Sequence, residues 1–316
     1  MVSGLEFSAI TEAAQRIRSH VHRTPVLTSK AIDGMCGATL FFKCENLQKA
    51  GAFKARGACN AVFSLSEEEA GRGVLTHSSG NHAGALAMAA QKRGIKSYIV
   101  MPNNAPAVKQ AAVEGYGGEI HFCEPNLTAR ESLTDKIAEQ TGATLIHPYN
   151  DLRVMAGQGT AALELLEQVQ DLDMVLTPVG GGGLLSGTAA VVNRLSTKTK
   201  VIGAEPQGAD DAFRSFRAGK IIPMEEPNTI ADGLLTSLGD LTFEVISKYV
   251  HDIVTVSDKA IIAAMRNVWE RMKIIIEPSS AVPVAALMDK KLNISGKRIG
   301  VVLSGGNVDL NRLPWS

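Results

Sequence analysis

Net charge, cysteine and long apolar segments are what this sequence has least of. Its 32 basic and 32 acidic side chains leave a formal net charge of zero, so no strong field attracts nucleic acid or an anionic membrane. No apolar run reaches the ~18 residues that a membrane-spanning helix needs, and the N-terminus has no cationic stretch followed by an apolar core. We therefore expect a cytoplasmic protein whose partner is a small molecule rather than nucleic acid or a membrane.

Metal-binding and disulfide patterns are also missing. The four cysteines, Cys36, Cys44, Cys59 and Cys123, contain no close-spaced pair of the kind that binds zinc or exchanges disulfides. We expect them to be reduced thiols. The seven histidines are scattered without a pair at helical spacing, which argues against a catalytic zinc site.

What is present is an alternation of short β-branched segments with longer helical patterns along nearly all of the 316 residues. This alternation is typical of an α/β protein with parallel sheets and helices on both faces. The predicted strands cover residues 40–43, 74–77, 97–101, 119–123, 143–147, 174–178, 201–205 and 298–303. The predicted helices cover residues 7–19, 55–63, 81–93, 127–141, 154–169, 184–195, 258–272 and 279–290.

Four short motifs lie where predicted strands end or helices begin. They are Lys54 within residues 48–57, Ser-Ser-Gly-Asn-His at 78–82, the glycines at 180–183, and Ser-Gly-Gly-Asn at 304–307. Ligands of parallel sheets bind beyond the carboxyl ends of the strands. Each motif alone is weak, because a lone lysine is usually a solvated cation and a glycine run is often only a loop. Together they predict one cofactor site, with an amine for an aldehyde, glycine-rich turns for anions and a hydroxyl for a ring nitrogen.

On these motifs the chain resembles the serine racemase and serine/threonine dehydratase family of pyridoxal-phosphate enzymes, which have the tryptophan-synthase-β fold (fold-type II). Further segments carry the resemblance: residues 147–150, 156–160, 204–206, 229–233, 269–272 and 276–278. The resemblance implies a two-domain α/β enzyme with parallel-rich twisted sheets and helices on both faces. A small domain of residues 73–148 would be inserted in a large domain made of residues 1–72 and 149–316. It also implies a homodimer.

The cofactor residues follow from chemistry and from the resemblance. Lys54 would hold the aldehyde covalently and, once released, act as a base. The glycines at 180–183 precede a helix, so their N–H groups and the helix dipole can bind a phosphate. A nicotinamide dinucleotide is the alternative, because Glu205 lies about 20 positions on, but Leu185 breaks the G-x-G-x-x-G spacing. The expected cofactor contacts are Phe53, Lys54, Asn81, Gly180, Gly181, Gly182, Gly183, Leu184, Gly233 and Ser304.

The substrate side centres on the helix start at residues 78–82, where backbone N–H groups can take a carboxylate. The resemblance places Ser79 opposite Lys54. Racemisation needs a second group to return a proton to the other face, and several dehydratases of the family have alanine there, so Ser79 favours a racemase. The alternative is that Ser79 only caps the helix. The expected substrate contacts are Ser78, Ser79, Gly80, Asn81, His82, Arg130, Tyr149 and Thr236.

Ser304 resembles the group that meets the pyridine nitrogen of the cofactor. A hydroxyl cannot stabilise a charged pyridinium as an aspartate does, so the ring is expected to be a weaker electron sink. Loss of a β-hydroxyl would then compete with reprotonation. We therefore expect β-elimination to accompany racemisation.

The resemblance also implies a divalent cation, Mg, Mn or Ca, held by Glu205, Asp211 and the carbonyl oxygen of Ala209. Oxygen ligands of this kind suit these ions. The competing interpretation is that two acidic residues six positions apart lie in a loop and are simply solvated.

The leading hypothesis is a pyridoxal-phosphate-dependent serine racemase that also dehydrates serine to pyruvate and ammonia. The alternative is a dedicated ammonia-lyase acting on L-serine, L-threonine or 3-hydroxyaspartate. Two hypotheses from other classes are a binding protein without catalysis and a nicotinamide-dependent oxidoreductase. Because the sequence ends soon after Leu310, we expect no appended regulatory domain and no feedback control by isoleucine.

Overall fold

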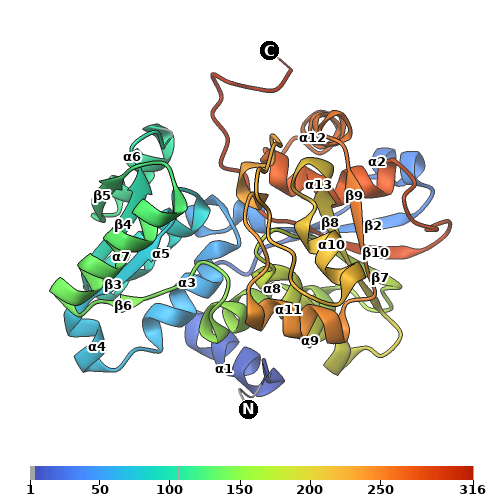
Figure 1. Cartoon of the computed structure of the whole chain (residues 1–316). Coiled ribbons are helices and arrows are strands. Elements are labelled where there is room, and N and C mark those ends of the chain that lie inside the picture. Colours follow the sequence, from blue (N-terminus) through green and yellow to red (C-terminus); the bar gives the residue numbers. More distant parts are fainter. Residues whose placement is uncertain (1–3, 106, 316) are drawn as a thin grey trace.

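The computed structural model describes residues 4–105 and 107–315 and contains two sheets (Figure 1). The larger has the strand order β1-β2-β10-β7-β8-β9, and the smaller has the order β5-β4-β3-β6. The larger sheet consists of β1 (Val26–Leu27), β2 (Thr39–Cys44), β7 (Met174–Pro178), β8 (Lys200–Pro206), β9 (Asp252–Val256) and β10 (Arg298–Leu303). The smaller consists of β3 (Val74–His77), β4 (Ser97–Pro102), β5 (Glu119–Cys123) and β6 (Thr144–Leu145).

Every strand pair is parallel except the antiparallel pair of β1 with β2. The helices are α1 (Phe7–Ile17), α2 (Lys30–Cys36), α3 (Lys54–Phe63), α4 (Glu67–Arg72), α5 (Asn81–Arg93), α6 (Ala107–Gly115), α7 (Leu127–Thr141), α8 (Leu152–Gln168), α9 (Gly183–Leu195), α10 (Asp211–Ala218), α11 (Asp240–Tyr249), α12 (Asp258–Met272) and α13 (Pro278–Met288). The predicted fold class, an α/β protein with parallel-rich sheets and helices on both faces, is confirmed.

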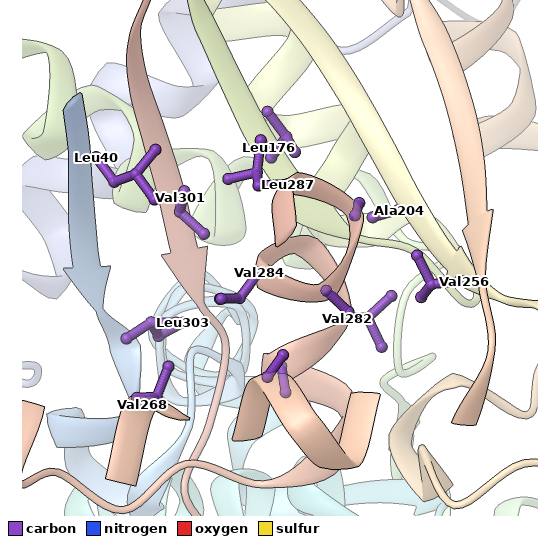
Figure 2. Packing of buried hydrophobic residues seen from close by; sticks show 14 of the residues in the cluster. Leu40, Leu176, Ala204, Val256, Val268, Val282, Val284, Leu287, Val301 and Leu303 are labelled. Carbon is purple, nitrogen blue, oxygen red and sulfur yellow. The ribbon is translucent and has the colours of Figure 1, made fainter. Parts of the chain in front are cut away.

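The larger sheet is buried on both faces. Successive side chains of a strand point to opposite sides, so each strand contributes to two cores. Leu176 of β7 belongs to the core that contains α12 and α13, whereas its neighbour Val175 packs into the core that contains α9 and α11. Figure 2 shows Val282, Val284 and Leu287 of α13 packed against the strands on the first of these faces. A helix that is apolar all round, as α13 is, must be enclosed in this way.

The two sheets draw on different parts of the chain. All strands of the smaller sheet lie between residues 74 and 145, whereas the larger sheet uses segments from before and after that stretch. In Figure 1 the two sheets occupy separate lobes, with α3 and α5 at the junction. Helix α3 contacts both α5 and α8, so the helix that begins with Lys54 packs against both lobes.

One predicted strand is shorter in the structure, whereas the expectation for the cysteines holds. The strand predicted at 143–147 is confined to Thr144–Leu145, because the chain turns after Ile146. All four cysteines are free and buried, in agreement with the expected reduced thiols. In the described part of the chain no helix is long and apolar enough to cross a bilayer.

Candidate active site

The predicted motifs meet at the junction of the two lobes. The backbone N–H of Phe53 donates to the carbonyl of Ser304 over 2.9 Å, which joins the start of α3 to the end of β10. The side chain of Asn307 reaches Asn81 at the start of α5 over 3.0 Å. Three segments that are far apart in sequence therefore form one site, at the carboxyl ends of β3 and β10.

Lys54 lies partly buried at the first position of α3. Its Nζ donates to the carbonyl oxygen of Pro148 over 2.8 Å and lies 5.2 Å from the ring centroid of Phe53. Burial lowers the pKa of Lys54 to about 8, and the nearby Glu277 carboxylate opposes this only in part. An amine with this pKa is neutral far more often at neutral pH than an exposed lysine, as a nucleophile or base requires.

The glycines at 180–183 leave no room for side chains. A Cβ on Gly181 would lie 2.3 Å from the Tyr149 ring, and one on Gly180 would lie 2.9 Å from the backbone of Leu234. Gly182 has φ of 88° and caps α9 without a side-chain hydrogen bond. The first N–H groups of α9, those of Gly183 and Leu184 among them, therefore have no side-chain cap. This loop has the properties of an anion site, so the residues present fit a phosphate-bearing cofactor.

Asn81, the first residue of α5, makes contacts that the sequence analysis did not predict. Its Nδ2 donates to both carboxylate oxygens of Glu277, over 2.8 and 3.1 Å. Gly80 caps the helix without a side-chain hydrogen bond, and the Ser78 hydroxyl accepts from the Gly80 N–H over 3.3 Å. Ser79 is partly exposed between them. A contact between Asn81 and the cofactor stays a prediction.

Glu277 is the residue that the sequence-based site omitted. It is 3% exposed, and burial, followed by the charge of Asp232, raises its pKa to about 7. Its neighbours come from distant segments, so only its place in the Ile-Glu-Pro motif at 276–278 marked it in the sequence. Gly305 is required beside it, because a Cβ there would lie 2.6 Å from the carboxylate.

Of the predicted substrate residues, Tyr149 and Thr236 are in contact through a side-chain hydrogen bond. His82 is buried, and its Nε2 donates to the carbonyl of Ile146 over 3.2 Å. Arg130 on α7 is half-buried and close enough to His77 to lower its pKa, after the larger effect of burial. The N–H of the predicted cofactor residue Gly233 donates to Ser279 Oγ over 3.0 Å.

The predicted metal residues lie together, but not in a loop. Glu205 is the penultimate residue of β8 and Asp211 is the first residue of α10; Ala209 lies in the short helix η3 (Gln207–Ala209) between them. All three are fully buried, so the interpretation of solvated carboxylates is wrong. Glu205 accepts from the N–H groups of Ala212 and Phe213.

Asp211 Oδ1 is buried and has no hydrogen-bond partner in the described ranges. Burial raises the pKa of Glu205 to about 9, with the Asp211 charge as the second cause, and burial raises that of Asp211 to about 6. Two buried carboxylates with an unpartnered oxygen fit a small divalent cation. Within the described residues no group of three or more His, Cys, Asp or Glu side chains forms a metal cluster.

The start of α9 is suited to hold a phosphate, and Lys54 is suited to hold an aldehyde. Pyridoxal phosphate carries both groups on one ring, so this fold and site are those of an enzyme that uses pyridoxal phosphate. The chain belongs to the family described as pyridoxal-phosphate dependent enzyme, whose model matches residues 17–305, and within it to the serine racemase and dehydratase group.

The relatives support this group. A beta-hydroxyaspartate dehydratase of Paracoccus denitrificans is 52% identical over 304 residues, covering 96% of this chain and 96% of the relative. A serine racemase of Dictyostelium discoideum is 52% identical over 308 residues, covering 96% of this chain and 95% of the relative. A crystal structure of serine racemase from Dictyostelium discoideum matches with a TM-score of 0.94, covering 98% of this chain and 100% of that chain.

Proposed function

We propose that this enzyme is a serine racemase that interconverts L- and D-serine and also dehydrates serine to pyruvate and ammonia. The observation that carries the proposal is Ser79, a partly exposed hydroxyl in the loop before α5. The racemase and the dehydratase relatives are equally similar in identity, so similarity alone does not choose between them.

In this proposal each residue has a definite task. Bound pyridoxal phosphate supplies an electron sink for the carbanion at the substrate α-carbon. Lys54 Nζ takes the α-proton on one face, and Ser79 Oγ delivers a proton on the other. The N–H groups at the start of α5 hold the substrate carboxylate, and the start of α9 holds the phosphate. Ser304 would meet the ring nitrogen of the bound cofactor as a neutral hydroxyl.

The test is incubation of the purified enzyme with L-serine, L-threonine and L-threo-3-hydroxyaspartate. Oxo acid is measured in a coupled assay, and the enantiomers of the remaining amino acid are separated by chiral chromatography. Abundant D-serine together with pyruvate is the expected result. Oxo acid without any D-amino acid would contradict the racemase and select a dedicated ammonia-lyase.

A dehydratase of 3-hydroxyaspartate is the second candidate, and Arg130 favours it. This guanidinium contributes to the pKa shifts of both His77 and Tyr149, which supports a place for it on the proposed substrate side, where it would pair with a second carboxylate. Faster turnover of 3-hydroxyaspartate than of serine, lost in Arg130→Met, would select this candidate.

Ser79→Ala is expected to separate the two reactions. Formation of D-serine should fall by roughly 10²-fold or more, because the proton donor on one face is gone, whereas pyruvate formation should change only a few-fold because Lys54 remains. Chiral and pyruvate assays on the same samples measure both rates. Ser64→Ala, at an exposed serine that is not among the predicted site residues, is the control. Unchanged D-serine formation in Ser79→Ala would contradict the role proposed for Ser79, which makes no capping hydrogen bond to α5.

We also propose a structural divalent cation, Mg, Mn or Ca, bound by Glu205, Asp211 and the Ala209 carbonyl. A ligand at about 100 times its Kd adds about 2.7 kcal/mol of stability, so chelation should lower the melting temperature of a 316-residue chain by about 4 °C. Asp211→Asn should abolish the response to added Mg, whereas Asp252→Asn, at an exposed ion pair with Arg217, should retain it. A melting temperature that is insensitive to chelator would contradict the proposal.

The two domains, 73–148 and 1–72 with 149–316, stay a proposal, and their outermost residues 1–3 and 316, like residue 106, lie outside the described ranges. Two contacts would join them: Asn81 with Glu277, and the ion pair of Lys109 with Asp232. The homodimer and the cytoplasmic location also stay predictions.

A further inference from the structure

The connection between β6 and α8, residues 146–150, contacts both Lys54 and α11. It lies against Lys54, whose Nζ donates to the Pro148 carbonyl over 2.8 Å. At its far end Asn150 Nδ2 donates to Asp240 of α11 over 2.6 Å. The 146–150 connection therefore links the amine of Lys54 to the larger lobe. Its conformation determines which backbone group lies beside that amine.

His147 holds this connection in a turn. Its Nδ1 lies 2.9 Å from the backbone N of Asn150 and 3.4 Å from that of Tyr149, and both N–H groups donate to it. A nitrogen that accepts in this way carries no proton, so the geometry assigns the ring proton to Nε2. The imidazole closes the turn as an Asn side chain does in an Asx-turn.

One peptide group links His147 to Lys54. The carbonyl that accepts from Lys54 and the N–H of Tyr149 that points at His147 belong to the same peptide, the one between Pro148 and Tyr149. This unit is planar, and its C=O and N–H point in opposite directions. Fixing the N–H at the imidazole therefore directs the carbonyl at Lys54 Nζ. The ring of Pro148 restricts φ and limits the alternatives further.

The imidazole is itself held in place and kept neutral. Its ring lies edge-on to those of His77 and Tyr149, with centroids 5.3 and 4.6 Å away. Burial, followed by the charges of His77 and Lys54, lowers the pKa of His147 to about 4, against smaller opposing effects of Asp151 and Asp240. Nδ1 therefore remains an acceptor at neutral pH.

The charged groups around the lysine do not replace this contact. The Glu277 carboxylate raises the pKa of Lys54, while the imidazole of His82 lies close enough for Lys54 to lower the pKa of that histidine, after burial. The Pro148 carbonyl is thus the neutral acceptor that Lys54 contacts directly.

We propose that His147 is a positioning residue for Lys54, which acts by closing the 146–150 turn so that the Pro148 carbonyl binds and orients the lysine amine. The proposal rests on the role proposed for Lys54 as the base, and it assigns His147 no contact with substrate or cofactor. Two substitutions test the acceptor nitrogen and the ring of His147 separately. His147→Phe keeps a ring between His77 and Tyr149 but has no acceptor, whereas His147→Asn keeps an acceptor for the turn but loses the ring.

The first measurement is made on the full-length chain freed of cofactor. Lys54 is reductively methylated at a series of pH values, and labelling of its peptide is followed by mass spectrometry to obtain its pKa. A carbonyl stabilises the charged amine, so His147→Phe should lower this pKa by about 1, and His147→Asn should leave it unchanged. In the holoenzymes, kcat should fall by roughly 10-fold in His147→Phe, with KM unchanged.

The other patterns overturn either the proposal or the role of Lys54 on which it rests. An unchanged pKa of Lys54 in both variants would show that the acceptor nitrogen of His147 does not act on the lysine. A change in His147→Asn alone would show that packing of the ring matters instead. If the variants do not fold, ¹⁵N NMR of the unmodified chain decides: a proton found on Nδ1 of His147 would overturn the assignment. Should the pKa shift while kcat does not, the turn is right and the role proposed for Lys54 is wrong.

Discussion

Lys54→Ala abolishes both the reaction and the visible absorbance of the purified holoenzyme. This is the expected result because one side chain supplies both functions: the covalent attachment of the aldehyde and the base on one face. Positioned acid–base catalysis alone contributes about 10²–10⁴-fold, and loss of the attachment adds to that. No second lysine replaces it, because the hydrogen bond to Pro148 and the low pKa of about 8 belong to the first position of α3.

The measurement is an absorption spectrum and a turnover assay on protein supplied with excess pyridoxal phosphate. Lys49→Ala is the matched control, since Lys49 is five positions earlier, half-buried and outside the site. It should retain both colour and activity. A Lys54→Ala protein that still shows the visible band after gel filtration would mean that another amine holds the cofactor.

Some elements around this site have the bounds that the sequence predicted. Strand β3 and helix α5 have the predicted bounds, because Gly73 and Gly94 lie on either side of them with positive φ values, 84° and 72°. Helix α4 was missed although its capping box of Ser66 and Glu69 is readable in the sequence. Strand β1 is two residues long, and its existence depends on pairing with β2, which no local pattern shows.

The wrong strand end at 143–147 has a physical cause that also defines the site. The pattern of residues 143–147 predicts a strand as far as His147, but the imidazole of His147 accepts the N–H of Asn150 and turns the chain. Such side-chain closure of a backbone turn is a local hydrogen bond that competes with the strand, and strand propensity does not include it.

Lys54 and the glycines at 180–183 each lie in one short segment at a helix start, so the sequence places them there without reference to any distant residue. Their roles toward the cofactor stay predictions. Glu277 depends on Asn81, which is 196 residues earlier, and sequence spacing does not show that contact. Glu205 and Asp211 were predicted as a pair, and their complete burial excludes the alternative that two acidic residues six positions apart are simply solvated.

A buried ionic network holds the helix that carries Lys54. Arg56, two positions later and fully buried, donates to Glu45 over 2.7 and 2.8 Å and to Glu164 of α8 over 2.8 and 2.9 Å. Lys43 of β2 donates to Glu164 over 2.6 Å. Two cations and two carboxylates balance, so the network is neutral as a whole. It fixes the first turn of α3 against β2 and α8.

Arg56→Met is expected to lower the free energy of unfolding by about 3–5 kcal/mol, because the neutral side chain leaves Glu45 and Glu164 buried with Lys43 as the one remaining cation of the network. Denaturant unfolding of the wild type and the variant measures the difference. Arg23→Met is the control, since the pair of Arg23 with Glu167 has the same 2.8 Å separation but is about half exposed, and its loss should cost less than about 1 kcal/mol. Equal effects of the two substitutions would show that burial of the network does not stabilise α3. A larger loss at Arg56, together with weaker cofactor binding, would tie this network to the placement of Lys54, because the two residues share one helical turn.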